Sequence, residues 1–175
     1  TVAITTFNYE RYIENAVKSV LKCNNLNYID LIVIDDGSTD NTRKRVKKYN
    51  SLKYFYKKNG GPSSARNFVI SKVKTPFLIF LDADDEFITD SLDKAIINLK
   101  SIQDNGRVCI FDHIAKFSSK EKYIHNGGVT ENNFSNLKNY LFSKKLKILN
   151  GATIFPTKLF KLGNYPERYR SGEDI

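Results

Sequence analysis

The sequence predicts an α/β fold with a mainly parallel central sheet flanked by helices. Short apolar, β-branched runs alternate along the chain with longer segments in which apolar residues recur every three or four positions. The short runs are typical of strands buried on both faces, and the longer segments are typical of amphipathic helices. Alternation of strands and helices favours a parallel sheet with helices packed on its faces.

The first hundred residues carry the clearest pattern. Apolar runs predict strands at residues 2–4, 31–34, 52–56 and 77–81. The segments between and after them predict helices at residues 10–22, 41–49, 63–72 and 91–103. The first, third and fourth helices each have an apolar stripe, whereas the second is chiefly basic.

From residue 107 the pattern is looser. Strands are expected at residues 108–111 and 153–155, and a helix at residues 137–142. No repeat, low-complexity tract or linker interrupts the chain, so we expect residues 1–175 to form one domain. The sequence begins inside an apolar run, contains no Met and stops one residue after Asp174, so we expect it to be part of a longer protein.

The composition narrows the class of protein. With 41% apolar residues, the chain can bury a sizeable core. No stretch approaches the ~20 apolar residues of a membrane-spanning helix, and the N-terminus does not resemble a signal peptide. Cys23 and Cys109 fit neither a metal-site spacing nor a disulfide framework, which indicates a reducing compartment. We therefore expect a cytoplasmic protein.

The formal net charge of +9 raises the question of a nucleic-acid partner. The basic residues are scattered over short runs, including 43–45, 57–58 and 144–147, and no nucleic-acid-binding motif accompanies them. Such runs are usually solvated helix faces. The remaining interpretation is attraction to phosphorylated ligands or, at a membrane surface, to anionic lipid head groups. No nucleic-acid partner is expected.

The most informative feature is the acidic run that follows the fourth strand. Four carboxylates occur within five residues, at Asp82, Asp84, Asp85 and Glu86. Asp82 and Asp84 are two residues apart and therefore point to the same side of an extended chain. Crowded carboxylates repel one another, and a divalent cation with hard oxygen ligands relieves this repulsion. The alternative is that Asp84 or Asp85 caps a following helix.

Two other predicted strands also end in polar residues. The first runs into Thr5-Thr6-Phe7-Asn8, and the second into Asp35-Asp36-Gly37-Ser38-Thr39-Asp40. Ligands of open α/β sheets bind outside the carboxyl ends of the strands, so these clusters are expected to converge with the acidic run. Asp35 and Asp36 can accept hydrogen bonds from a base or a ribose. Alternatively, the second segment is a turn in which Ser38 or Thr39 caps the basic helix. Asn8 fits a ligand and a cap of the first helix equally well.

A glycine-rich loop precedes the third predicted helix. Residues 59–67 combine glycines and amides with a helix start, which suits an anion, although the spacing of a Walker loop is absent. Arg66 lies near the start of this helix, where the helix dipole disfavours a cation. Its expected partner is a diphosphate or one of the carboxylates of the site. By itself, the terminal Glu173-Asp174 pair fits a surface loop.

Taken in order, these residues resemble the family 2 inverting, nucleotide-sugar-dependent glycosyltransferases, which have a Rossmann-like GT-A fold. The likeness covers nearly the whole chain. The matching segments are Thr6-Phe7-Asn8, Asp35 to Asp40, Asn59-x-Gly61, Ala65-Arg66-Asn67, Phe80 to Asp85 and Gly172-Glu173-Asp174. The resemblance implies a nucleotide-binding half over residues 1–105 and an acceptor-side half over residues 106–175. Chains of the family continue beyond the Glu-Asp pair.

The resemblance also implies roles for the donor side. Asp35 or Asp36 would hold the nucleobase, and Thr6 would lie close to the base and ribose. Arg66 would face the nucleotide, with Asn8 nearby. Asp82 would contact the ribose or a metal, and Asp84 would be the principal ligand of Mn²⁺ or Mg²⁺.

For the transfer step, the resemblance implies that Asp174 is the general base, with Glu173 as the next candidate. The implied reaction passes a sugar, with inversion, from a nucleotide sugar to a hydroxyl of a saccharide or lipid-linked saccharide. The resemblance implies UDP as the commonest nucleotide of the sugar donor, with dTDP and GDP as alternatives. Two other functions remain open at this point: a sugar-1-phosphate nucleotidyltransferase and a non-catalytic nucleotide-sugar-binding domain.

Overall fold

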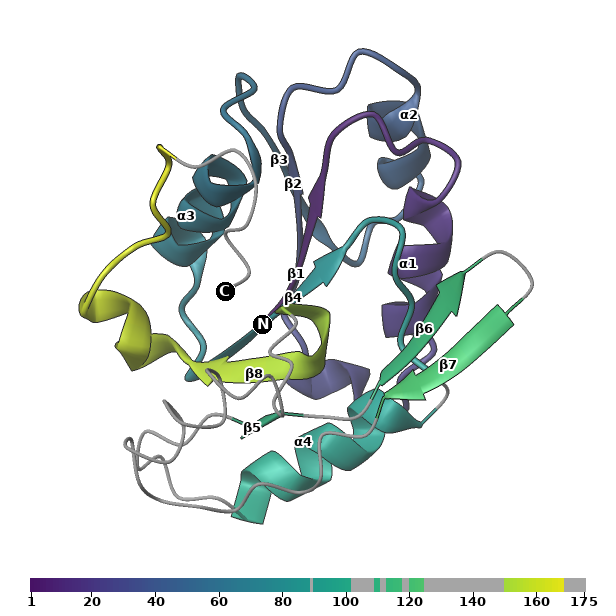
Figure 1. The fold of residues 1–175 in the computed structure, drawn as a ribbon, viewed down its shortest axis with the longest axis vertical. Coiled ribbons are helices and arrows are strands. Elements are labelled where there is room, and N and C mark those ends of the chain that lie inside the picture. Colours follow the sequence, from purple (N-terminus) through teal and green to yellow (C-terminus); the bar gives the residue numbers. More distant parts are fainter. Residues whose placement is uncertain (89, 102–108, 111–112, 118–119, 125–149, 169–175) are drawn as a thin grey trace.

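A six-stranded sheet forms the centre of the molecule (Figure 1). The computed structural model describes residues 1–88, 90–101, 109–110, 113–117, 120–124 and 150–168. The strand order is β3-β2-β1-β4-β8-β5. The strands are β1 (Val2–Thr6), β2 (Leu31–Asp35), β3 (Lys53–Tyr56), β4 (Phe77–Asp82), β8 (Thr153–Pro156) and β5 (Cys109–Ile110). The first four named are parallel, and β8 is antiparallel to both β4 and β5, so the predicted mainly parallel sheet is confirmed.

Helices cover both faces of this sheet. On one face, α1 (Ile13–Leu21) and α4 (Ser91–Ser101) contribute to a core with Val2, Ile4, Leu31 and Val33. The other face packs against α3 (Pro62–Lys72) and uses the alternate strand residues, such as Ala3, Ile32 and Ile34. This alternation follows from the two-residue period of a strand, and it explains why the central strands are apolar throughout.

The register aligns the carboxyl ends of three neighbouring strands. Thr6 of β1 is paired with Asp35 of β2, and Thr5 of β1 is paired with Asp82 of β4. The polar residues that follow these strands therefore start from one edge of the sheet, as the sequence predicted.

Several boundaries differ from the prediction. The first helix begins at Ile13 rather than at residue 10, and the basic helix α2 is limited to Thr42–Val46. Short 3₁₀ helices, η1 (Leu26–Tyr28), η2 (Asn150–Ala152) and η3 (Thr157–Lys161), occur at places where no helix was predicted. The predicted helix at residues 137–142 lies outside the described residues.

A separate two-stranded sheet was not predicted. It pairs β6 (His113–Phe117) with β7 (Lys120–Ile124) in antiparallel fashion. The sequence of this hairpin is mixed in charge and polarity, so it lacks the apolar run that identified the central strands. Within the described part of the chain, no helix has both the length and the apolar character needed to cross a membrane.

Candidate functional site at the carboxyl ends of the central strands

Asn8 joins the loop after β1 to the loop after β2. Its backbone N–H donates to Ser38 Oγ at 2.9 Å, and its side-chain Oδ1 accepts a hydrogen bond from the Thr39 N–H at 2.8 Å. The backbone of Asn8 is left-handed, with a φ of 58°, which asparagine tolerates better than most residues. The N-cap of α1 is Tyr12, so the alternative that Asn8 caps this helix is wrong.

A second pair of contacts continues this junction. The Glu10 N–H donates to Asp40 Oδ2 at 3.0 Å, and Glu10 Oε2 accepts from the Asn41 N–H at 2.8 Å. Asp40 Oδ1 also accepts from the Thr42 N–H at the start of α2. Ser38 and Thr39 bond to Asn8 and make no cap of α2, so that alternative is wrong as well. The two loops therefore form one connected surface beside the strand ends.

Asp35 is the last residue of β2 and is completely buried. Its Oδ1 accepts from the Ser38 N–H at 2.7 Å, and its Oδ2 accepts from the Tyr54 hydroxyl at 2.6 Å. Burial and this bond to Asp35 raise the pKa of Tyr54, which keeps the hydroxyl protonated and donating. A carboxylate has about four lone-pair positions, so Asp35 retains capacity to accept from a ligand.

Unlike Asp35, Asp36 uses its carboxylate to bind the glycine-rich loop before α3. Its carboxylate accepts from Lys57 Nζ at 2.5 Å and from the N–H groups of Gly60 and Gly61 at 3.1 and 2.8 Å. Asn59 Nδ2 also donates to the backbone oxygen of Asp36. Gly61 has a φ of +86°, a conformation that favours glycine. Asp36 thus fixes the chain that leads into α3.

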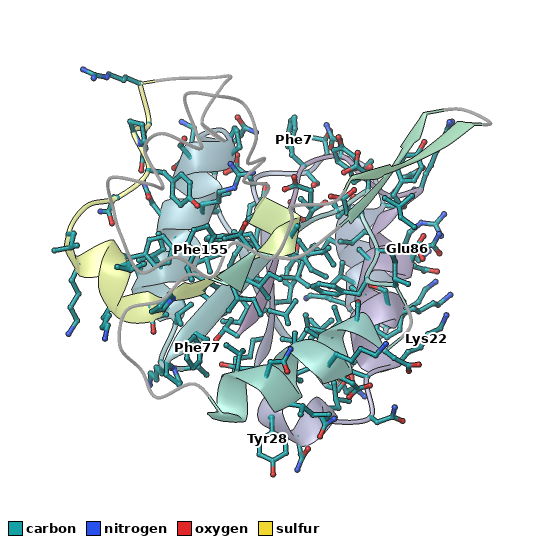
Figure 2. The ribbon with its side chains drawn as sticks, turned by 60° about the horizontal axis from the view of Figure 1, so that its bottom comes forward. Phe7, Lys22, Tyr28, Phe77, Glu86 and Phe155 are labelled. Carbon is teal, nitrogen blue, oxygen red and sulfur yellow. The ribbon has the colours of Figure 1, made fainter. Side chains whose placement is uncertain are left out.

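Thr6 lies between these residues and the acidic run. It is 4% exposed, and its Oγ1 has no hydrogen-bond partner among the described residues. A buried hydroxyl in this situation is costly unless a ligand supplies the missing partner. Phe7 follows directly, is 43% exposed, and points away from the body of the molecule (Figure 2).

The acidic run turns away from β4 as a loop. Ala83 is buried, whereas Asp84, Asp85 and Glu86 are exposed. Because α4 begins only at Ser91, neither Asp84 nor Asp85 caps a helix, and that alternative is wrong. Loss of solvation together with the charges of Asp82 and Asp84 raises the pKa of Asp85 to about 6. The pKa of Tyr9 is also raised, chiefly by Asp84, which places this tyrosine near the same charges.

The carboxylates of Asp82 and Asp84 provide the hard oxygen ligands that Mg²⁺ and Mn²⁺ prefer. In the described ranges, no three His, Cys, Asp or Glu side chains are close enough together to hold an ion by themselves. An ion at Asp82 and Asp84 would therefore need further oxygens, such as those of a diphosphate. Besides the loss of solvation, the charges of Asp82 and Asp84 raise the pKa of Asp85, and a nearby positive charge would relieve this repulsion.

Arg66 supplies positive charge on the other side of Asp82. Its side chain is 3% exposed, and its Nη2 lies 3.4 Å from Asp82 Oδ1. The guanidinium also lies over the ring of Tyr165, 5.6 Å from the ring centroid. A carboxylate of the site was one of the two partners that the sequence indicated for Arg66.

The structure therefore brings Thr6, Asp35, Arg66 and Asp82 to one edge of the sheet. Glu173 and Asp174 lie outside the described residues. Sequence reasoning missed Tyr54. The strand Lys53–Tyr56 contains two tyrosines, and nothing in its sequence shows which hydroxyl contacts Asp35. It also assigned Lys57 to a solvated surface, and this is wrong because Lys57 is 16% exposed and pairs with Asp36.

Comparison with known proteins agrees with this geometry. The sequence model of glycosyl transferase family 2 matches residues 1–162. An uncharacterized glycosyltransferase of Rickettsia conorii is 35% identical over 182 residues, which cover 99% of this chain and 28% of the relative. The poly(ribitol-phosphate) β-N-acetylglucosaminyltransferase TarS of Staphylococcus aureus is 26% identical over 190 residues, which cover 99% of this chain and 30% of TarS.

Solved structures show the same fold. Residues 1–349 of TarS in complex with UDP-GlcNAc match with a TM-score of 0.76 and 25% identity, over 99% of this chain and 50% of that chain. The mannosyltransferase PcManGT of Pyrobaculum calidifontis, in complex with GDP-Man and Mn²⁺, matches with a TM-score of 0.70 over 99% of this chain and 48% of that chain. At 17% identity, this second likeness shows the fold alone. The chain spans less than a third of the length of the two curated relatives named above and about half of the length of these solved chains. It has the GT-A fold and belongs to glycosyl transferase family 2.

Proposed function

We propose that the chain binds a UDP-sugar and transfers its sugar, with inversion, to a hydroxyl of a saccharide or lipid-linked saccharide. The observation that carries this proposal is the alignment of Thr6, Asp35 and Asp82 at one edge of the sheet, with Arg66 beside Asp82. TarS, which is 25% identical over nearly the whole chain, has been solved with UDP-GlcNAc. The choice of UDP rests on that likeness.

On the donor side, Asp35 accepts hydrogen bonds from the base or ribose, and the Thr6 hydroxyl gains its partner from the same ligand. Asn8 and Asp36 support the site without contacting the donor. Asn8 holds the two loops together, and Asp36 fixes the loop before α3. This division refines the expectation from sequence, which left Asp35 and Asp36 equivalent.

The residues present fit a divalent metal together with a diphosphate. Asp84 and Asp82 would hold Mn²⁺ or Mg²⁺, with phosphate oxygens completing the coordination. When bound, the metal neutralises negative charge that builds up on the leaving nucleoside diphosphate. Arg66 offers the planar guanidinium suited to phosphate oxygens.

The transfer step needs one base. Asp174 accepts the proton of the acceptor hydroxyl as that oxygen attacks the anomeric carbon from the face opposite the leaving group. Glu173 is the next candidate. A single displacement of this kind inverts the anomeric configuration. The exposed basic residues of α2, such as Arg43 and Lys44, support contact with phosphorylated ligands or with an anionic membrane surface on the cytoplasmic side.

The test measures UDP binding to the full-length protein by calorimetry, with Mn²⁺ and with a chelator. We expect much tighter binding with Mn²⁺, and we expect Asp84→Asn to remove most of the difference. Glu86→Gln is the matched control, because Glu86 is an exposed carboxylate of the same loop that has no proposed role. Equal affinity with Mn²⁺ and chelator would refute the metal site. Binding without release of UDP from a nucleotide sugar on turnover would favour a non-catalytic binding domain.

A further inference from the structure

Asn67 fastens the chain that follows η3 onto α3. Its Oδ1 accepts from the Tyr165 N–H at 2.9 Å, and its Nδ2 donates to the Tyr165 carbonyl at 2.9 Å. The same Nδ2 donates to Glu167 Oε1 at 2.8 Å. The side-chain amide of Asn67 thus pairs with both backbone groups of Tyr165, as a neighbouring strand would, although the two residues are 98 positions apart in the sequence. Asparagine is a weak helix former, and these bonds offset the cost of placing it inside α3.

The bonds from Asn67 hold the backbone of Tyr165 and so limit where its ring can lie. This ring packs edge-on against Phe80 of β4, at 5.8 Å between centroids, and is stacked on Phe160 at 6.2 Å. The Arg66 guanidinium lies over the same ring, 5.6 Å from the ring centroid. Two neighbouring residues of α3, Arg66 and Asn67, therefore contact the same tyrosine, one through its ring and the other through its backbone.

The contacts around Tyr165 limit the positions that the buried guanidinium of Arg66 can take. The Arg66 side chain is only 3% exposed, so its charge needs partners within the protein. The face of an aromatic ring attracts a cation without cancelling its charge. The separation of 3.4 Å between Arg66 and Asp82 is longer than the about 2.7–2.9 Å of a tight charge-assisted bond. Asp82 keeps 43% of its side chain exposed at the edge of the sheet. Arg66 is thus held close to the carboxylate at a separation longer than that of a tight ion pair.

We propose that Tyr165 and Asn67 are positioning residues that hold the Arg66 guanidinium at Asp82 for the diphosphate of the donor. The inference rests on the proposed function and adds two residues from outside the strand ends. Tyr165 acts through its ring, and Asn67 acts by fixing Tyr165. Neither residue has to touch the nucleotide.

The test compares UDP with uridine as ligands of the full-length protein in the presence of Mn²⁺. Tyr165→Leu keeps an apolar side chain but removes the ring face. We expect about tenfold weaker UDP binding, the size of a cation–π contact, with uridine binding unchanged. Tyr165→Phe keeps the ring and should bind UDP as the wild type does. Asn67→Ala should weaken UDP binding about fivefold without affecting uridine.

A matched control is Tyr28→Leu, because Tyr28 is exposed and lies at the opposite end of the molecule from Phe7 (Figure 2). Thermal unfolding of each variant shows whether it is folded. Equal losses for UDP and uridine would mean a general structural role and would overturn the inference. Unchanged UDP binding in Tyr165→Leu and Asn67→Ala, or an equal loss in Tyr165→Phe, would overturn it too. Absence of UDP binding by the wild type would instead refute the proposed function.

Discussion

Tyr54 donates its hydroxyl hydrogen to Asp35 at 2.6 Å, although the residue directly across the sheet from Asp35 is Tyr56. Tyr54 and Tyr56 are two positions apart on β3 and lie on the same face, so the contact is a diagonal one. A long aromatic side chain is needed to span that diagonal. Strand β3 therefore places the Tyr54 hydroxyl beside the buried carboxylate at the end of β2.

We expect Tyr54→Phe to lower the free energy of unfolding by about 1–2 kcal/mol, because a bond to a buried carboxylate is lost. Since Asp35 also loses orientation, UDP binding should weaken several-fold. Urea unfolding and calorimetry measure the two effects. Tyr56→Phe is the matched control, because Tyr56 is 52% exposed. Equal behaviour of the two variants would contradict a role for the Tyr54 hydroxyl.

A second prediction concerns the loop held by Asp36. Asp36→Asn keeps one carbonyl oxygen but places an amide against Lys57 and the glycine N–H groups. We expect hydrogen exchange at Gly60 and Gly61 to become about tenfold faster, which corresponds to about 1.4 kcal/mol of local opening energy. Exchange monitored by mass spectrometry measures this.

Removing the partner of Asp36 provides an independent check on this loop. Lys57→Met should have a similar but smaller effect on exchange at Gly60, whereas Lys58→Met should have none, since Lys58 is exposed. Protection of Gly60 that is the same in Asp36→Asn and in the wild type would show that the loop is ordered without this carboxylate.

The parallel sheet was predictable because its strands are buried on both faces, which leaves an apolar run that few other structures produce. The convergence of Thr6, Asp35 and Asp82 was predictable for a related reason. Once the strands are parallel and adjacent, their carboxyl ends lie at one edge whatever the detailed register. These parts of the site follow from the order of elements alone.

The helix caps were not predictable in the same way. Ser38, Thr39, Asp84 and Asp85 are all good capping residues, but a cap is a local bond that competes with bonds to other loops. Ser38 and Thr39 are hydrogen-bonded to Asn8 instead. Asp84 and Asp85 lie in a loop that continues to residue 90, before α4 starts. Contacts across 30 positions of sequence depend on how the loops meet, and a single sequence does not specify that.

Asp93 anchors the end of α1 to the start of α4, and this contact predicts a pH dependence. Its carboxylate accepts from Cys23 Sγ at 3.0 Å and from the N–H groups of Asn24 and Asn25 at 3.0 and 2.9 Å. The bond from Cys23, followed by those from the asparagines, lowers the pKa of Asp93 well below its usual range. A lowered pKa stabilises the fold above the unfolded value of about 3.9 and loses that effect as the pH falls toward the native value.

We therefore expect Asp93→Asn to melt at a lower temperature than the wild type at pH 7, with a smaller difference at pH 3. Thermal unfolding at pH 7, 5 and 3 measures the change. Glu86→Gln, which alters an exposed carboxylate, should follow the wild type at each pH. A difference that does not depend on pH would show that the shape of Asp93, rather than its charge, is what matters.

The last prediction separates transfer from donor binding. If Asp174 is the base, it acts only when the acceptor oxygen attacks, so it contributes to the transition state and little to the bound donor. Asp174→Asn in the full-length protein should then bind UDP with Mn²⁺ as the wild type does, while transfer falls by several orders of magnitude. Asp84→Asn should show the opposite order of effects, with donor binding lost first. Comparing UDP affinity with the transfer rate in both variants decides the matter. Substantial transfer by Asp174→Asn would move the base to Glu173, and parallel loss of binding and transfer would mean that the segment has a structural role instead.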